Sequence, residues 1–146
     1  MRVTVQAAAF DPGAELARFS AQANAVGAIV TFTGIVRDQS GTLLALEIEH
    51  YPAMTEPAIA GMVSDAADRW HLADALVIHR HGRLVPGEPI MMVATAAAHR
   101  AEAFLAAEFL MDYLKSRAPF WKKEITTAGA AWVAATAGDE QALTRW

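Results

Sequence analysis

Helical and strand-like segments alternate along this sequence, with single helices placed between short groups of strands. β-Branched and alternating residues predict strands at residues 2–6, 27–37, 43–50, 75–82, 89–95, 120–126 and 131–135. Helical spacing and end signals predict three helices, at residues 12–24, 54–70 and 98–117. Because strands close in sequence tend to pair antiparallel, the pattern predicts an α+β fold with a mainly antiparallel sheet and three helices. The polar turn at residues 38–41 also predicts a hairpin between residues 27–37 and 43–50.

Composition narrows the class of protein further. The 146 residues, 54% of them hydrophobic, contain no repeat and no linker, so we expect one domain spanning residues 1–146. A net charge of −4 argues against nucleic-acid binding. No apolar run is long enough for a membrane span and no signal peptide is evident, so we expect a cytoplasmic protein without membrane partners.

Metal and cofactor chemistry finds little support in the sequence. The chain has no Cys, which excludes disulfides, thiolate metal sites and Cys nucleophiles. His79 and His81 share a strand face, but no acid lies near them in sequence to complete a metal site. Phosphate-binding and dinucleotide-binding glycine motifs are also absent. We therefore expect no metal and no cofactor.

The three lysines are confined to one short stretch, whereas nine arginines are spread along the chain. They are Lys115, Lys122 and Lys123. A lysine can lose its proton when it is desolvated and then act as an acid, a base or a nucleophile, which an arginine effectively cannot do. The clustering marks these amines as candidate catalytic groups. Chance placement on solvated positions is the alternative.

The predicted helix at residues 98–117 determines where the amine of Lys115 lies. Phe104, Ala107, Met111 and Leu114 recur at helical spacing and predict its buried stripe. Lys115 lies about 40° from Met111 around the helix, so its amine emerges at the edge of an apolar surface. The alternative is a surface lysine paired with Asp112, three residues earlier.

The first turn of the same helix carries His99 and Arg100. Ala98 cannot cap the helix, so free backbone N–H groups, a guanidinium and an imidazole could converge there on a phosphate or a carboxylate. If the helix begins nearer Thr95, which can cap it, these two residues are ordinary surface residues.

Two further strands offer candidate side chains. Alternation places Lys122 and Glu124 on one face of the strand at 120–126, and Lys123 on the other. A lysine beside a carboxylate and near Lys115 is a candidate for a perturbed pKa, although a solvated ion pair is the alternative. Arg37 ends a strand just before a polar turn, a common position for a substrate-binding side chain.

These residues lie within segments that resemble the catalytic (large) subunit of molybdopterin synthase. The matching segments follow one another in order over nearly the whole chain and are residues 27–37, 46–54, 78–84, 98–100 and 111–124. Such a set of motifs at the right spacing is far more specific than any single motif in the sequence.

The resemblance implies an α/β hammerhead-type fold and a homodimer flanked, in a heterotetramer, by two small ubiquitin-like sulfur-carrier subunits. The carrier's C-terminal Gly-Gly thiocarboxylate would supply sulfur to cyclic pyranopterin monophosphate and form the molybdopterin dithiolene. The resemblance also implies roles for individual residues. By position, Lys115 and Lys122 match essential lysines, Arg37, His99 and Arg100 match substrate contacts, Lys123 and Glu124 complete the Lys122 segment, and Phe32 and Met111 match apolar pocket positions.

These expectations combine into a hypothesis about the site. Lys115 is expected to be the principal catalytic amine, with Lys122 supporting it by charge and Glu124 orienting Lys122. Arg100 and Lys115 are about 22 Å apart along one helix, so a shared site requires the helix start of a second subunit. Residues 120–126 and 131–135 are expected to form a hairpin. The family commonly has basic residues where this chain has Ala131 and Thr136, which puts contacts from that hairpin in doubt.

Two functions of other classes fit the same residues. The chain could be a non-catalytic binding module for an anionic metabolite, with the lysines as ligands. It could also be an adaptor that docks the tail of a carrier protein. Only an enzyme would release a dithiolene product from a thiocarboxylated carrier and the pterin precursor.

Overall fold

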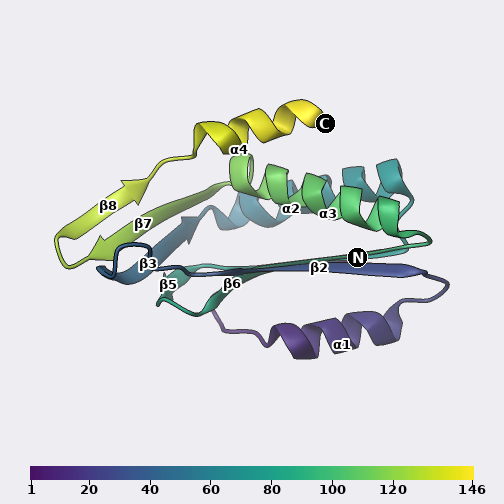
Figure 1. Ribbon diagram of the computed structural model, residues 1–146, viewed down its shortest axis with the longest axis horizontal. Coiled ribbons are helices and arrows are strands. Elements are labelled where there is room, and N and C mark those ends of the chain that lie inside the picture. Colours follow the sequence, from purple (N-terminus) through teal and green to yellow (C-terminus); the bar gives the residue numbers. More distant parts are fainter.

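A computed structural model describes residues 1–146 as two four-stranded sheets with four helices (Figure 1). The strands are β1 (Arg2–Gln6), β2 (Ala28–Ile35), β3 (Leu43–His50), β4 (Asp74–Arg80), β5 (Gly82–Leu84), β6 (Pro89–Ala97), β7 (Phe120–Thr126) and β8 (Gly129–Val133). The helices are α1 (Pro12–Gln22), α2 (Pro52–Trp70), α3 (Arg100–Ser116) and α4 (Ala137–Ala142), and a 3₁₀ turn (Leu143–Arg145) follows α4. The α+β class is confirmed.

The expectation of three helices is wrong, because the C-terminal segment forms a fourth. The hydroxyl of Thr136 accepts a hydrogen bond from the backbone N–H of Asp139 at 3.2 Å and caps α4. The chain end is held to α3, where the indole N–H of Trp146 donates to Asp112 at 2.6 Å. Six residues are too few to show helical periodicity clearly, so this helix depends on its cap and on tertiary contacts.

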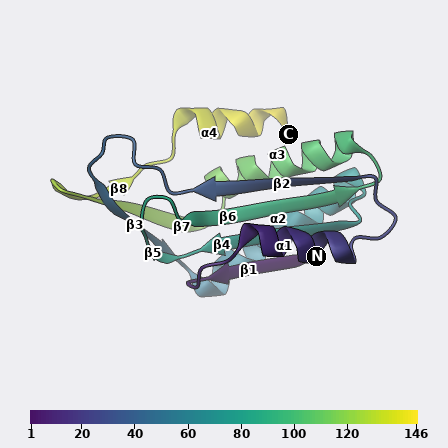
Figure 2. The ribbon, with the colours of Figure 1, turned by 60° about the horizontal axis from the view of Figure 1, so that its bottom comes forward.

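The first sheet has the strand order β1-β4-β6-β2 (Figure 2). All neighbours are antiparallel except β1 and β4, which are parallel. α1 covers one face of this sheet, and α2 and α3 cover the other (Figure 1). Helices on both faces explain why β4 and β6 are buried along nearly their whole length and read as continuous apolar runs.

The second sheet has the order β5-β3-β7-β8 and extends the molecule beyond the helices (Figure 1). The expected hairpin between β2 and β3 is wrong, since β2 pairs with β6 and β3 pairs with β5 and β7. In the connecting turn the Asp38 carboxylate accepts hydrogen bonds from the backbone N–H groups of Gly41 and Leu43. This turn leads the chain out of one sheet and into the other. The hairpin of β7 and β8 forms as expected.

The helix α3 links the two sheets and determines where the lysines lie. It packs through Ala103, Ala106, Leu110 and Leu114, all buried, while the Phe104 side chain is 59% exposed. Of the expected stripe, Ala107 and Leu114 are buried as predicted, whereas Phe104 is exposed and Met111 is half-buried. Gly27 permits close contact at the start of α3, because a Cβ there would lie 2.3 Å from the Ala98 carbonyl oxygen. None of the helices combines the length and apolarity needed to cross a membrane.

Candidate functional site

Lys115 and Lys122 come together where the end of α3 meets β7. The short connection through Pro119 turns the chain from the helix directly into the strand, so the two lysines are only seven positions apart in sequence. Both side chains line a cavity of about 350 Å³, which we call cavity I. Its walls also include Phe32 and Met111, the two apolar positions expected near the pocket, together with Arg37.

A second cavity, cavity II, adjoins cavity I at the lysine pair and measures about 240 Å³. It shares His79, Leu114, Lys115 and Lys122 with cavity I. Its remaining walls come from Ala118, Phe120, the strand end and linker at residues 133–136, and Asp139. The two amines thus form a partition between two recesses, one with an arginine at its edge and one lined mainly by small or apolar residues.

The two lysines differ in their electrostatic surroundings. Burial lowers the pKa of Lys122, the positive charge of Lys115 lowers it further, and the carboxylate of Asp139 partly opposes both effects. Lys115 is 54% exposed, and its Nζ lies 4.0 Å from Oδ1 of Asp139. The sequence alternative paired Lys115 with Asp112, but that carboxylate binds Arg145 and Trp146. Desolvation therefore acts mainly on Lys122.

His79 forms the wall that both cavities share. Its side chain is 2% exposed, and its ring stacks on Phe120 with centroids 3.8 Å apart. Nδ1 lies 2.8 Å from the carbonyl oxygen of Arg80, and because a carbonyl only accepts, Nδ1 carries the proton. Burial lowers the pKa of His79 to about 3, and the charge of Lys122 contributes to the shift. At neutral pH the imidazole is uncharged, and Nε2 is a free acceptor.

Other expected site residues occupy different positions around this pair. Glu124 lines cavity I on the same face of β7 as Lys122, as predicted, and forms no ion pair with it. Lys123 lies on the opposite face, where its Nζ is 4.7 Å from the ring centroid of Trp132, and it lines neither cavity. Arg37 is exposed at the edge of cavity I and has no ion-pair partner.

His99 and Arg100 lie at the opposite end of α3 from the lysines. His99 is the N-cap residue and makes no side-chain capping bond, so the first N–H groups of the helix are not satisfied by a side chain. The alternative start at Thr95 is wrong, because Thr95 belongs to β6 and donates its hydroxyl to the Ala103 carbonyl. Along the helix axis Arg100 lies about 22 Å from Lys115. Within one chain these residues do not form a single site.

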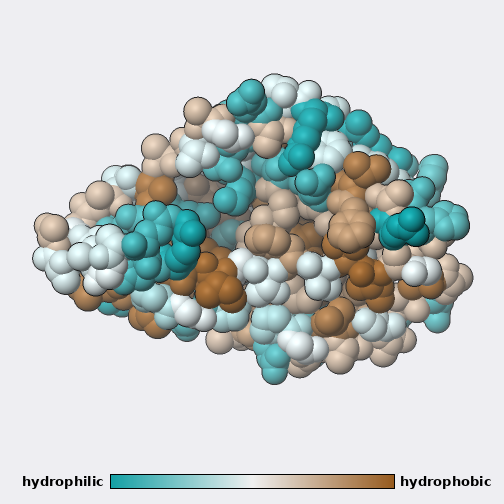
Figure 3. All heavy atoms as spheres, in the orientation of Figure 1, coloured by the Kyte–Doolittle hydropathy of each residue, from teal (hydrophilic) through white to brown (hydrophobic).

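A partly apolar surface runs along α3 between Phe104 and Lys115. Its apolar walls include Val30 and Phe32 of β2 and Phe104 and Met111 of α3, around a shallow groove of about 490 Å³. The lining also includes the charged side chains of Glu108, Asp112, Lys115, Asp139 and Arg145. Apolar side chains are visible along this side in Figure 3. Because β2 is also an edge strand of its sheet, one row of its backbone hydrogen-bonding groups is unpaired. We call this surface the β2–α3 face.

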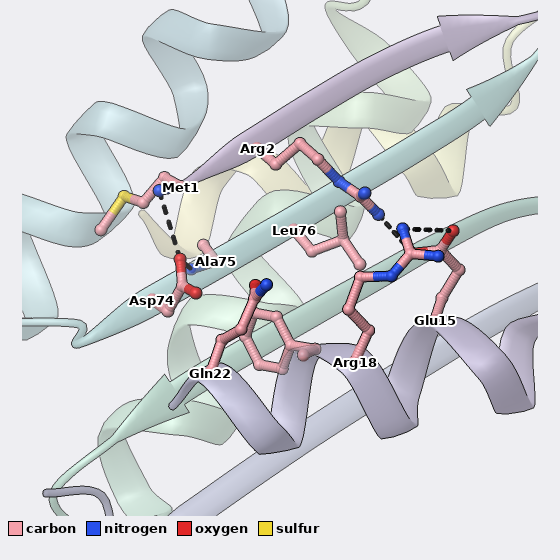
Figure 4. A pocket seen from close by; sticks show the side chains of 9 residues that line it. Met1, Arg2, Glu15, Arg18, Gln22, Asp74, Ala75 and Leu76 are labelled. Atoms are coloured by element: carbon pink, nitrogen blue, oxygen red, sulfur yellow. Dashed lines mark hydrogen bonds and ion pairs between the residues drawn. The ribbon is translucent and has the colours of Figure 1, made fainter. Parts of the chain in front are cut away.

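A further cavity, of about 290 Å³, lies between α1 and the first sheet (Figure 4). Its charged groups are paired with one another. The carboxylate of Glu15 contacts both Arg2 and Arg18, and Asp74 accepts from the amino group of Met1 at 3.3 Å. This compensation leaves little net charge to attract a ligand. No group of three or more His, Cys, Asp or Glu side chains has an arrangement suited to metal binding.

Two residues of the site, His79 and Asp139, did not emerge from the sequence as site residues. Alternation predicted a shared face for His79 and His81, but the stacking partner Phe120 is distant in sequence. The ring of His81 instead lies 4.4 Å from that of His50. Asp139 follows a long exposed segment, and only the docking of α4 on α3 brings its carboxylate to Lys115. Both positions depend on tertiary contacts.

Comparison with known proteins identifies the family of the chain. The family described as MoaE protein matches residues 5–117. A molybdopterin synthase catalytic subunit from Cereibacter sphaeroides is 72% identical over 146 residues and covers all of both chains.

Solved structures give the same result. The molybdopterin biosynthesis MoaE protein from Burkholderia ambifaria superposes with a TM-score of 0.85 at 47% identity, covering 99% of this chain and 96% of that one. Molybdopterin synthase from Staphylococcus aureus superposes with a TM-score of 0.81 at 28% identity, covering 90% and 96%. This chain therefore belongs to the MoaE family, the catalytic subunits of molybdopterin synthase in molybdenum cofactor biosynthesis.

Proposed function

We propose that this chain transfers sulfur from the C-terminal thiocarboxylate of a small ubiquitin-like carrier protein to cyclic pyranopterin monophosphate. Two transfers, with opening of the cyclic phosphate, produce the dithiolene of molybdopterin. The observation that carries the proposal is the meeting of Lys115 and Lys122 between two cavities. A reaction between two separate molecules requires adjoining recesses with the reacting groups at their junction.

The surroundings of the two amines suggest a division of roles. We assign proton transfer to Lys122, because its lowered pKa brings the neutral amine closer to the working pH. Lys115 is more exposed and already faces a carboxylate, so we assign it to binding and stabilising anionic groups. This assignment reverses the roles expected from the sequence, where Lys115 was the principal amine and Lys122 its support.

Substrate contacts follow from the charges around cavity I. Arg37 is unpaired and suits the phosphate of the pterin, while Phe32 and Met111 offer apolar surface to its ring system. Glu124 lies on the same wall and is a candidate acceptor for the amino or ring N–H groups of a pterin. Cavity II, with its small side chains, suits the narrow Gly-Gly terminus of the carrier.

The remaining basic residues call for a second copy of the chain. A two-fold contact through the β2–α3 face, with its axis perpendicular to α3, would set two α3 helices antiparallel. The start of each α3 would then approach the end of the other, so that His99 and Arg100 of one subunit face Lys115 of its partner. We therefore propose a composite site in a homodimer with one carrier on each subunit, each subunit having the α/β hammerhead-type fold, and a cytoplasmic location.

An assay with purified components tests the proposal. The chain is mixed with thiocarboxylated carrier and cyclic pyranopterin monophosphate, and the dithiolene product and the carrier mass are followed together. We expect product from the wild-type chain and a loss of about 10²-fold or more in the Lys115→Ala and Lys122→Ala variants. Binding of both ligands without product would instead identify a binding module, and binding of the carrier alone an adaptor.

A further inference from the structure

The position of Asp139 suggests a function that the reaction itself does not require. Its carboxylate is the one that forms an ion pair with Lys115, at 4.0 Å, and its side chain is 27% exposed. The same residue lines cavity II together with both lysines. The free protein therefore holds a carboxylate of its own beside the amines, inside the recess suited to the carrier terminus.

The charges around this position show why an anion is favoured there. Lys115 projects from α3, Lys122 and Glu124 from β7, His79 from β4, and Arg37 follows β2. Two ammonium groups close together repel each other, and the lowered pKa of Lys122 reflects that repulsion in part. Asp139 offsets it, since its charge raises the pKa of Lys122. Glu124 makes no ion pair with either amine.

The segment that carries Asp139 is held mainly by surface contacts. α4 has no buried residue. Its ion pair between Arg117 and Glu140, at 2.7 Å, joins exposed side chains, and the aromatic anchor Trp146 lies beyond the helix at the chain end. Exposed ion pairs contribute little free energy, and segments with few buried contacts open at low cost. The carboxylate can therefore leave Lys115 without disturbing the core.

We propose that Asp139 occupies, in the free protein, the anion position that the carrier's terminal thiocarboxylate takes when it binds. The two groups have the same charge and nearly the same shape, and each fits an ammonium group at the wall of cavity II. Asp139 then acts as an internal competitor that keeps the lysine pair compensated until a carrier arrives. This inference rests on the proposed function, because it names the occupant of the same site.

Asp139→Asn is the direct test, since it removes the charge and keeps the size of the side chain. Glu140→Gln is the matched control, because it removes one charge from the next residue of the same helix, which pairs with Arg117 away from the cavity. We expect Asp139→Asn to lower the KM for the thiocarboxylated carrier by about two- to fivefold, as fits the loss of one partly exposed ion pair. Glu140→Gln should leave the KM unchanged.

A second measurement reports on the lysines without the reaction. Labelling with an acid anhydride at a series of pH values, read by mass spectrometry, gives the titration of each amine in the free chain. Asp139→Asn should shift the labelling of Lys122 to lower pH, because a charge that raises its pKa is gone. The Glu140→Gln variant should label like the wild type.

The outcomes separate this inference from the proposed function. If the wild-type chain neither binds the carrier nor forms product, the proposed function fails. If the wild type is active and Asp139→Asn has the same KM as Glu140→Gln, or a higher one, Asp139 is not a competitor and the inference is wrong. A lower KM in Asp139→Asn alone, together with the shifted labelling of Lys122, supports it.

Discussion

The imidazole of His79 lies flat against the ring of Phe120, with centroids 3.8 Å apart and planes 17° from parallel. The contact joins a central strand of the first sheet to the first residue of β7. It thereby fixes the strand that carries Lys122 against the sheet below. Because the ring is buried and its Nδ1–H is used by the Arg80 carbonyl, this junction requires a neutral imidazole.

The first prediction is that this imidazole makes the stability of the protein depend on pH. The pKa of His79 is lowered from 6.5 to about 3 in the folded protein, so below pH 6.5 the unfolded chain binds a proton that the folded chain does not. The free energy of unfolding should then fall as the pH drops from 6.5 towards 3, by up to about 1.4 kcal/mol per pH unit. Urea titrations between pH 7 and pH 4.5 measure this slope.

Two variants identify the source of the slope. His79→Gln should reduce the stability at pH 7 and flatten the decline below pH 6.5, since the titrating group is gone. His71→Asn changes an exposed histidine in a left-handed backbone conformation that Asn tolerates, and it should keep the wild-type slope. Equal slopes in the wild type and His79→Gln would show that another group controls the acid sensitivity.

The second prediction separates the roles of the two site lysines by replacing each with arginine. Arginine keeps the positive charge but cannot release its proton near neutral pH. Lys122→Arg should therefore lose about 10²-fold or more in kcat, as expected for the loss of a general acid–base group. Lys115→Arg should retain more activity than Lys115→Ala, because the guanidinium still offers a positive charge to the anionic groups that Lys115 is assigned to bind.

Initial rates of dithiolene formation at saturating carrier and pterin give these kcat values. Lys123→Arg is the control, since Lys123 lies on the far face of β7 over Trp132. The reverse ranking, with Lys122→Arg active and Lys115→Arg inactive, would return the principal role to Lys115.

Local patterns in the sequence were enough to predict most helices and strands and the face of β7 that carries Lys122 and Glu124. Alternation correctly separated Lys122 and Glu124 from Lys123, because the side chains of any strand alternate whatever its partner. The end of α3 before Pro119 was also predictable, since a proline restricts the residue that precedes it. These two local rules bring Lys115 and Lys122 to the same junction.

Which strands pair with each other, and which segments pack together, was not predictable from local patterns. The strands β2 and β3 have suitable sequences for a hairpin, but each pairs instead with a strand farther away in the chain. The stripe of α3 was misplaced in part for a related reason. Ala107 and Leu114 are buried as predicted, but Ala103 and Ala106 are also buried and Phe104 is left exposed. The carboxylate beside Lys115 likewise depends on where α4 docks.

The third prediction concerns Phe104, which the sequence placed in the buried stripe of α3 but which is exposed. If the β2–α3 face forms the homodimer, Phe104→Asp puts a charge into an apolar contact and should convert the protein to a monomer. Light scattering after size-exclusion chromatography measures the mass. Met54→Asp is the control, since Met54 is 59% exposed on α2, away from this face. A dimeric Phe104→Asp protein would exclude this face as the interface.

The fourth prediction tests whether the two ends of α3 serve one site across that interface. Arg100→Ala and Lys115→Ala should each be nearly inactive alone. In a mixed dimer, one site takes Lys115 from the first variant and Arg100 from the second, so it contains both wild-type residues, while the other site lacks both. After the subunits are mixed and allowed to exchange, about half of the dimers are mixed, so activity should recover to about a quarter of the wild-type value.

Arg100→Ala mixed with Arg100→Ala,Lys115→Ala is the matched control and should stay inactive. If the first mixture also stays inactive although mass spectrometry detects mixed dimers, then Arg100 and Lys115 act within one subunit or in separate sites.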